Sequence, residues 1–331
     1  MKGDLVKPLP AQGNNKAGNF FRKWEVFLTV FLIAVMLLNS RLTEYFWDPF
    51  NLGDATANFA EKGIMALAMA LLILVREIDL SVASIIALSS LVMGLLAKQG
   101  LDTPVLIVAG ILTGALCGLL NGFLVVRFAI PSIAITLGTM SLFRGISQAI
   151  LGDTALTEYP ESFAALGQSY WFTYLPISFV VFLVLAVLVG GVLHLTRLGR
   201  NLYAMGNNPE AARFSGIQVL KNKLVLFLLS GTFAGLAAVF LTARISSTRP
   251  NIGQGWELDV ITMVVLGGVS IAGGTGSISG VVLAVLLLGM ISFGMGLLNI
   301  PGIVGSIVVG SLLILAIALP NILQKLSRKK K

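Results

Sequence analysis

Long apolar runs dominate the chain and are separated by short polar segments. A membrane-spanning helix needs about 20 mostly apolar residues, and ten runs approach that length. This pattern predicts an all-α, polytopic membrane protein with about ten transmembrane helices. The runs are Trp24–Asn39, Asn58–Val75, Leu80–Ala97, Pro104–Val126, Pro131–Leu151, Tyr174–Leu195, Lys223–Ala243, Leu258–Ile271, Ser277–Leu298 and Gly302–Pro320.

The composition agrees with a membrane location. Of the 331 residues, 56% are hydrophobic and 11% are charged, whereas a soluble domain carries about 25% charged residues. This balance excludes a secreted enzyme and a nucleic-acid-binding domain. The single cysteine, Cys117, and the single histidine, His194, exclude a disulfide framework and a His- or Cys-rich metal site. We therefore expect no metal and no cofactor on this chain.

The distribution of basic residues predicts the orientation. If the N-terminus is placed inside, 17 of the 23 Lys and Arg residues fall in inner segments, and such a bias marks the cytoplasmic side. Both termini are then cytoplasmic, and the basic segments face anionic lipid, which explains the net charge of +8 without nucleic acid. We expect a disordered tail over 1–23, a transmembrane domain over 24–320 with a cytoplasmic segment at 196–222, and a basic tail over 321–331.

Two apolar stretches are interrupted in the same way, which suggests a duplicated unit of the kind found in transporters. The first break, at residues 76–81, places Arg76, Glu77 and Asp79 close together. One interpretation is a broken helix beside a pathway, with Asp79 and Ser81 offering hydrogen bonds. The other is a tight cytoplasmic turn, in which Asp79 caps the next helix and Arg76 reaches the lipid head groups.

The second break spans Gly267–Gly280 and is rich in glycine. It lacks the lysine that a phosphate loop requires. Irregular backbone at membrane depth is tolerated where it is buried or lines water. The break is therefore either a hinge or unwound joint, or a site of close helix packing through small residues. Its candidate residues are Gly267, Gly268, Gly273, Gly274 and Gly276.

The cytoplasmic segment 196–222 contains the most specific local signal. Asn208 suits a helix N-cap, Pro209 the first helical position, and Gly216 a left-handed helix end. We expect a short helix on the cytoplasmic surface, suited to docking a soluble partner, or alternatively a loop helix that rests on lipid. The candidate docking residues are Asn207, Asn208, Pro209, Glu210, Ala211, Ala212, Arg213, Phe214, Ser215 and Gly216.

In their order and spacing, several blocks together resemble the membrane permeases of bacterial ABC importers for ribose, xylose, arabinose, rhamnose and related carbohydrates. The resemblance covers nearly the whole chain after the N-terminal tail. Arg76-Glu77 stands where that family usually has a glycine pair, which favours the rhamnose or autoinducer-2 branch. The blocks are Ile78–Val82, Gly118–Gly122 with Asn121, Thr136–Gly145, Gly199–Ile217 and Glu257–Gly280.

The resemblance implies a mechanism. Two permease subunits, identical or related, would form a pathway in the bacterial cytoplasmic (inner) membrane, to which Asp79, Ser81, Asn121 and the glycines of the second break would contribute. Cytoplasmic ATPase subunits would bind ATP and push on residues 207–216, and an extracytoplasmic binding protein would deliver the small carbohydrate. This chain would be no enzyme and would carry no catalytic residue. The alternative is an ion-coupled secondary sugar transporter, which would need ionisable groups near mid-membrane.

Overall fold

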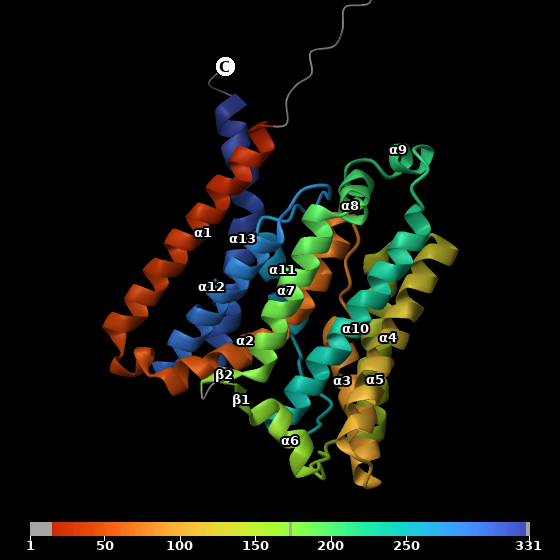
Figure 1. Ribbon diagram of the computed structural model, residues 1–331, viewed down its shortest axis with the longest axis vertical. Coiled ribbons are helices and arrows are strands. Elements are labelled where there is room, and N and C mark those ends of the chain that lie inside the picture. Colours follow the sequence, from red (N-terminus) through yellow and green to blue (C-terminus); the bar gives the residue numbers. More distant parts are fainter. Residues whose placement is uncertain (1–14, 172–173, 329–331) are drawn as a thin grey trace, which may run out of the picture.

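The structure is a computed structural model that describes residues 15–171 and 174–328. Figure 1 shows a bundle of long helices that run mostly along one direction. Within the described residues the elements, in chain order, are α1 (Asn15–Leu42), the 3-10 helix η1 (Glu44–Trp47), α2 (Pro49–Leu74), α3 (Val82–Lys98), α4 (Thr103–Phe128), α5 (Ser132–Leu151), α6 (Glu161–Gln168), β1 (Tyr170–Trp171), β2 (Leu175–Pro176), α7 (Ile177–Leu195), α8 (Arg197–Asn207), α9 (Pro209–Phe214), α10 (Val219–Ile245), α11 (Trp256–Leu266), α12 (Ile278–Leu297) and α13 (Gly302–Arg328).

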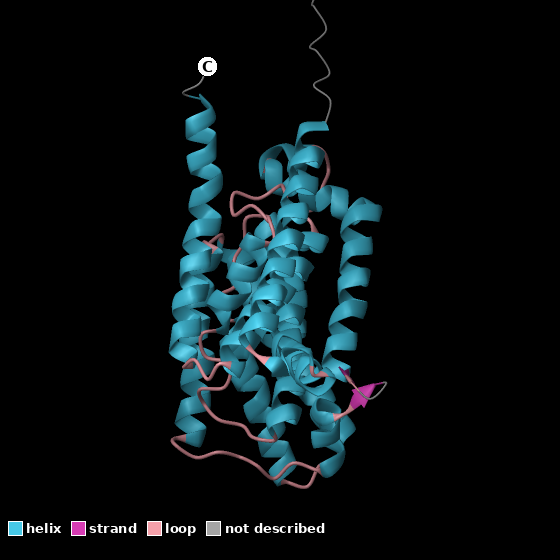
Figure 2. Cartoon of the chain, turned by 90° about the vertical axis from the view of Figure 1, so that its left-hand side faces the viewer, coloured by secondary structure: helices cyan, strands magenta, loops and turns pink. Residues whose placement is uncertain are grey.

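The all-α, polytopic fold is confirmed, because each of the ten predicted runs contains a helix. In the described part of the chain, seven helices are long and apolar enough to cross a membrane: α1, α2, α4, α5, α7, α10 and α12. The apolar part of α13 and the whole of α3 are shorter, and α11 has only 11 residues. Among the described residues, the β-structure is limited to the antiparallel pair β1–β2, drawn in magenta in Figure 2, and the isolated bridge between Leu156 and Thr248.

Three helices extend well beyond the runs predicted for them. The tail expected to be disordered over 1–23 is helical from Asn15, because the polar stretch before Trp24 continues the first helix; residues 1–14 lie outside the described chain. The last helix passes Pro320 and reaches Arg328, and residues 329–331 lie outside the description. Likewise, α2 begins at Pro49 rather than at Asn58, since the Asp48 side chain accepts hydrogen bonds from the first turn.

The centre of the bundle is α2, since 89% of its apolar window is buried inside the protein. Among the described helices, α4 and α10 share the most extensive contact, and they meet through glycines spaced four residues apart. A Cβ on Gly114 would lie 2.3 Å from the Gly231 carbonyl oxygen, and a Cβ on Gly118 would lie 2.2 Å from that of Phe227. Small residues at such spacing let helix backbones approach closely inside a membrane.

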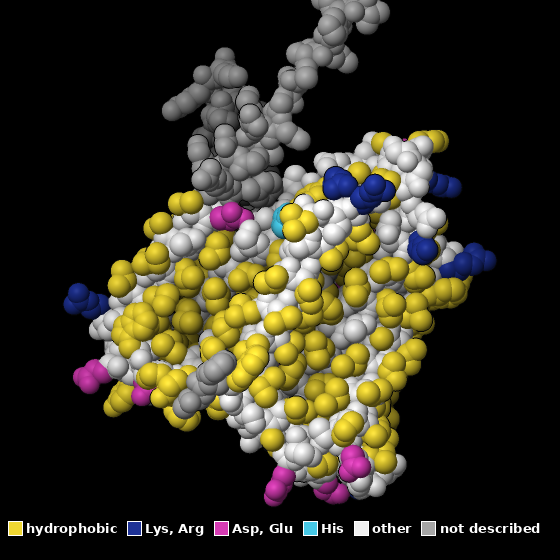
Figure 3. All heavy atoms as spheres, in the orientation of Figure 1, with side chains coloured by type: hydrophobic (Ala, Val, Ile, Leu, Met, Phe, Trp, Pro, Cys, Tyr) yellow, Lys and Arg dark blue, Asp and Glu magenta, His cyan; other side chains and the backbone are white. Residues whose placement is uncertain are grey.

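The two described chain ends lie at the same end of the molecule as α8 and α9 (Figures 1 and 2). Most of the Lys and Arg side chains on the face drawn in Figure 3 gather at this end, whereas Asp and Glu are more frequent at the opposite end. Exposed Arg197, Arg200 and Arg213 belong to the basic end. The location of both described chain ends at one end of the molecule agrees with the predicted even number of crossings, and the basic side chains gathered there agree with the predicted charge bias (Figures 1 and 3).

Candidate functional site

Residues 196–222, the segment predicted to be cytoplasmic, form the two helices α8 and α9 before α10 begins, rather than the single helix expected. The Asn208 side chain accepts hydrogen bonds from the backbone N–H groups of Glu210 (3.1 Å) and Ala211 (3.0 Å), and Pro209 opens α9. After α9, Gly216 has a φ of 83°, a conformation that glycine adopts without strain. The helix that the sequence reasoning missed is α8. The sequence signal for α8 was Thr196, whose side chain caps the helix by accepting a hydrogen bond from Gly199 N–H.

The exposed face of α9 carries Arg213 and Phe214, and the Phe214 side chain is 92% exposed. Ala212, by contrast, is only 4% exposed, and its carbonyl accepts a hydrogen bond from Ile217 N–H. A bulky residue at Ala212 would therefore disturb the packing of α9 against the rest of the protein rather than its exposed surface. Arg213 and Phe214 are the large exposed side chains of this helix, beside the exposed Glu210 and Ala211.

Arg76 joins the first break to the end of α8. Its Nε donates to the Gly206 carbonyl and its guanidinium NH2 to the Asn207 carbonyl, both at 2.7 Å. These bonds direct the exposed side chain to α8, and the two interpretations of the first break, a pathway and a tight cytoplasmic turn, stay predictions. Arg76 also has a φ of 67°, a left-handed conformation that is costly for a residue with a Cβ. The two charge-assisted hydrogen bonds offset that cost.

Gly206 is the point at which α8 touches both breaks. A Cβ on Gly206 would lie 2.0 Å from the Leu74 carbonyl oxygen and 2.4 Å from Gly274 N. The breaks are also bonded directly, since Gly274 N–H donates to the Leu74 carbonyl over 2.8 Å. The Asn207 amide donates to the Gly274 carbonyl over 3.3 Å. Three segments that are distant in sequence therefore meet in one junction, which we call the three-way junction: 74–77, 203–207 and 273–276.

Two further contacts hold the three-way junction. Tyr203 donates its hydroxyl hydrogen to the Gly276 carbonyl over 2.7 Å. Burial raises the pKa of Tyr203 above its ordinary value, so the phenol keeps its proton at neutral pH. Glu77 forms an ion pair with Lys223 of α10. Arg76-Glu77, the departure from the family's glycine pair, thus connects the first break with α8 on one side and α10 on the other.

The second break has the irregular backbone that its glycines suggested. Gly268, Gly273, Gly274 and Gly276 all have positive φ values. Gly267 instead provides close packing, because a Cβ there would lie 2.6 Å from the Cα of Val281. Both interpretations of this break, an unwound joint and tight helix contact, are therefore seen at different residues.

Asp79, Ser81 and Asn121 form a fully buried polar cluster. The Asp79 carboxylate accepts from Ser81 N–H (2.9 Å), Ser81 Oγ (2.6 Å) and Ser230 Oγ (3.0 Å), and Asn121 donates to Ser81 Oγ over 2.8 Å. All three are 0% exposed. The cluster connects the start of α3 with α4 and α10. The role of these residues and of the second-break glycines in a translocation pathway stays a prediction.

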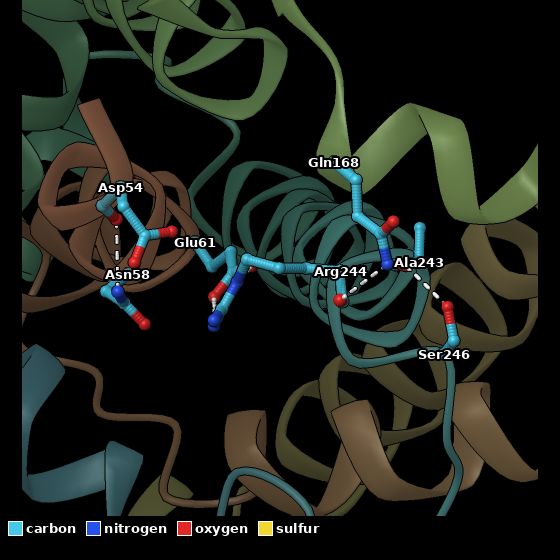
Figure 4. A network of polar contacts seen from close by, with 7 residues as sticks. All are labelled: Asp54, Asn58, Glu61, Gln168, Ala243, Arg244 and Ser246. Atoms are coloured by element: carbon cyan, nitrogen blue, oxygen red, sulfur yellow. Dashed lines mark hydrogen bonds and ion pairs between the residues drawn. The ribbon is translucent and has the colours of Figure 1, made fainter. Parts of the chain in front are cut away.

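An ionisable pair deep in the bundle was missed by the sequence reasoning. Glu61 lies near the middle of α2, is 0% exposed, and accepts two hydrogen bonds of 2.9 Å from the Arg244 guanidinium. Figure 4 shows this pair between α2 and α10, with Gln168 of α6 donating to the Arg244 carbonyl over 3.3 Å. The sequence analysis placed Glu61 near the beginning of the run Asn58–Val75, close to the end of a span. Only the start of α2 at Pro49 shows that Glu61 lies in the middle of the helix.

Comparison with known proteins places this geometry in a family. Residues 52–317, most of the chain, match the family described as "Branched-chain amino acid transport system / permease component". The match includes all three segments of the three-way junction.

Individual relatives are also similar over most of their lengths. The ribose import permease protein of Bacillus subtilis (strain 168) is 34% identical over 78% of this chain and 80% of its own. An autoinducer 2 import system permease protein of Yersinia enterocolitica is 35% identical over 81% of this chain and 83% of its own. The D-allose transport system permease protein of Escherichia coli (strain K12) is 34% identical over 94% of this chain and 96% of its own.

Proposed function

The chain belongs to the branched-chain amino acid transport system / permease component family, and from that premise we propose that it carries a neutral monosaccharide or related small carbohydrate into the bacterial cell. It is a membrane permease of the ABC importer type and not an enzyme. The named relatives import ribose, autoinducer 2 and D-allose, and these compounds define the cargo class. The ion-coupled alternative has no support from these relatives.

The importer needs partners that supply energy and cargo. We assign ATP binding to cytoplasmic ATPase subunits, cargo delivery to an extracytoplasmic sugar-binding protein, and the pathway to a pair of permease subunits. The end that carries α8, α9 and both described chain ends is the cytoplasmic one, because it carries the excess of basic side chains. The protein then lies in the cytoplasmic (inner) membrane with both termini inside.

The three-way junction is the observation that supports a coupling role for residues 207–216. A short helix is marginally stable by itself, so force applied to α9 can be transmitted only through the contacts that hold it and α8. Those contacts run from Gly206 and Asn207 to Arg76 of the first break and to Gly274 of the second. A push on α8–α9 therefore reaches both breaks at once.

Arg213 and Phe214 provide the docking surface. An exposed aromatic side chain next to an arginine is the combination enriched at the energetic centres of protein interfaces. Arg213 can also form charge-assisted hydrogen bonds with a partner's carboxylates. Neither side chain is needed to hold α9, since both point away from the bundle.

The test uses the full chain reconstituted in proteoliposomes with the ATPase subunits and the binding protein of its own transport system. We expect ATP-dependent uptake of at least one compound among ribose, D-allose, rhamnose and autoinducer 2. Uptake that requires an ion gradient and no ATP would overturn the proposal.

Charge reversal at α9 tests the docking surface. Arg213→Glu should abolish co-purification of the ATPase subunits and uptake, while the membrane level stays normal. Lys221→Glu is the matched control, because Lys221 is an exposed basic residue close by on α10 and not on α9. If Arg213→Glu behaves like Lys221→Glu, then residues 207–216 are not the coupling segment.

A further inference from the structure

A cavity of about 440 Å³ opens at the opposite end of α2 from the three-way junction. Its walls come from α2, α11, α12 and α13. Volumes of 300–1,000 Å³ are typical of small-molecule sites, so a monosaccharide has room here. On the proposed orientation, this cavity lies in the outer half of the membrane domain, where cargo arrives.

One wall is a polar stripe on α2. Asn51, Asp54, Asn58 and Lys62 line the cavity, and their spacing of three, four and four residues places them on one face of the helix. The stripe covers about 16 Å along the helix axis. Asp54 and Asn58 are exposed, whereas Lys62 is partly buried, so the polar wall continues from the mouth into the cavity.

The polar groups near the mouth keep free hydrogen-bonding capacity. Among the described residues, no side chain donates to the Asp54 carboxylate. The Asn58 amide donates to the Asp54 backbone carbonyl over 3.0 Å, as Figure 4 shows, and the Asn51 amide donates to the Tyr45 carbonyl over 3.2 Å. The Asn51 and Asn58 side-chain oxygens therefore remain acceptors for a ligand, together with the carboxylate.

Farther along the stripe, Lys62 is held in a fixed position. It forms an ion pair with Asp259 of α11, and its Nζ lies 4.9 Å from the centre of the Trp256 ring. An ammonium group has three N–H donors, so Lys62 can still donate a hydrogen bond to a ligand while it is paired with Asp259. The buried side chains of Phe59, Met263 and Leu288 also line the cavity and are apolar.

The charges indicate the class of ligand. The cavity lining carries two negative side chains, Asp54 and Asp259, and one positive side chain, Lys62. Its net charge is therefore negative and repels anions. The charge of Lys62 is also neutralised by its ion pair with Asp259. An amino acid would need a free cation for its carboxylate, which the described lining lacks. A neutral polyhydroxylated ligand fits better, because each hydroxyl group both donates and accepts a hydrogen bond. The acceptors stand at the mouth and the Lys62 donor stands deeper.

We propose that this cavity binds the carbohydrate cargo, with Asn51, Asp54 and Asn58 accepting hydrogen bonds from its hydroxyl groups and Lys62 donating to it. The proposal rests on the proposed function, since it takes the ligand to be the transported compound. It adds a cargo-contacting site whose polar wall is on α2 and whose other walls come from α11, α12 and α13.

Cysteine protection tests the site directly in the full chain, reconstituted with its partners. Cys117 is 6% exposed and is replaced by Ala, after which Asn58→Cys is labelled with a membrane-impermeant maleimide. Ribose, D-allose, rhamnose or autoinducer 2, whichever is imported, should slow the labelling several-fold, and leucine should not. Asp54→Cys serves as a second position. Asp102→Cys, an exposed residue of the α3–α4 loop outside the cavity, should be labelled at the same rate with or without sugar.

Uptake provides the second readout. Asp54→Asn should lower the uptake rate roughly tenfold, as expected for the loss of one charged hydrogen-bond acceptor, whereas Asp102→Asn should match the wild type. ATPase co-purification should be unchanged in both. Suppose that the wild type imports a sugar, but neither cysteine is protected and Asp54→Asn transports normally. The proposed cargo site is then wrong, whereas the proposed transport function is retained. If the wild type imports none of the four compounds, the proposed function fails first.

Discussion

The two ends of α2 present their polar groups in opposite ways. At the three-way junction, Arg76 and Glu77 are bonded to α8 and α10. At the cavity, Asp54 and Asn58 face open space and keep unused acceptors. On the proposed function, the bonded end transmits force to both breaks, and the open end exchanges water for the cargo.

Between these ends lies a third arrangement, the Glu61–Arg244 pair. It differs from the Lys62–Asp259 pair by its depth, because Glu61 is 0% exposed whereas Lys62 and Asp259 are 21% and 23% exposed. The neighbouring positions Glu61 and Lys62 point about 100° apart around the helix axis. Glu61 fixes α2 against α10, and Lys62 lines the cavity.

The largest expected effect follows from this difference in depth. Glu61→Gln removes a fully buried carboxylate from its two hydrogen bonds with Arg244, whose side chain is 20% exposed, and the unfolding free energy should fall by about 3 kcal/mol. Asp259→Asn removes a partly exposed pair and should cost about 1 kcal/mol or less. Thermal unfolding of the detergent-solubilised protein measures both. Equal losses would mean that the two pairs do not differ in the way that their burial indicates.

The next effect tests the tight contact in the three-way junction. Gly206→Ala places a Cβ against the Leu74 carbonyl and Gly274 N, and such overpacking typically costs about 1–3 kcal/mol. Because α8 is pushed away from both breaks, uptake should be lost as well. Gly191→Ala, which meets nothing within 4 Å in α7, should be neutral or stabilising through helix propensity. Normal uptake by Gly206→Ala would show that this contact transmits no force.

A smaller effect is expected in the buried cluster. Asp79→Asn keeps an oxygen that can accept from Ser81, and Ser230 can accept from the new amide, so the loss should be about 1 kcal/mol. Asp79→Ala leaves these donors without an acceptor and should cost about 1–3 kcal/mol, with impaired uptake. Uptake and thermal unfolding are measured together. If Asp79→Asn retains stability but loses all uptake, Asp79 acts on the cargo rather than on the packing of α3.

The sequence predicted much of this arrangement because membrane helices have long apolar runs and because caps have local signals. Asn208-Pro209 and Gly216 located α9 without any knowledge of the fold. The early start of α2 was missed, although Asp48-Pro49 is a capping signal of the same kind, because the polar residues that follow it lie outside the apolar run predicted at Asn58–Val75. Those polar residues, Asn51 and Asp54 among them, form the wall of the cavity.

The remaining features could not be predicted because they depend on contacts between distant segments. Arg76 was expected either beside a pathway or near lipid, and only the position of α8, 130 residues away, shows that it binds two carbonyl groups. Likewise, Ala212 is part of a small-residue helix in the sequence, but its burial depends on how α9 sits on the bundle. Local patterns locate elements, whereas the partners of buried polar groups require the packed structure.

The most direct test of the central claim, that α8 transmits the action of the ATPase to both breaks, is cargo-stimulated ATP hydrolysis by the Arg76→Gly variant in the reconstituted importer. Glycine tolerates the positive φ of this position, so the variant removes the two hydrogen bonds to α8 without adding backbone strain. The account predicts normal membrane level and normal co-purification of the ATPase subunits. It also predicts ATP hydrolysis that no longer responds to the loaded binding protein, with uptake lost. Wild-type stimulation together with wild-type uptake would contradict it.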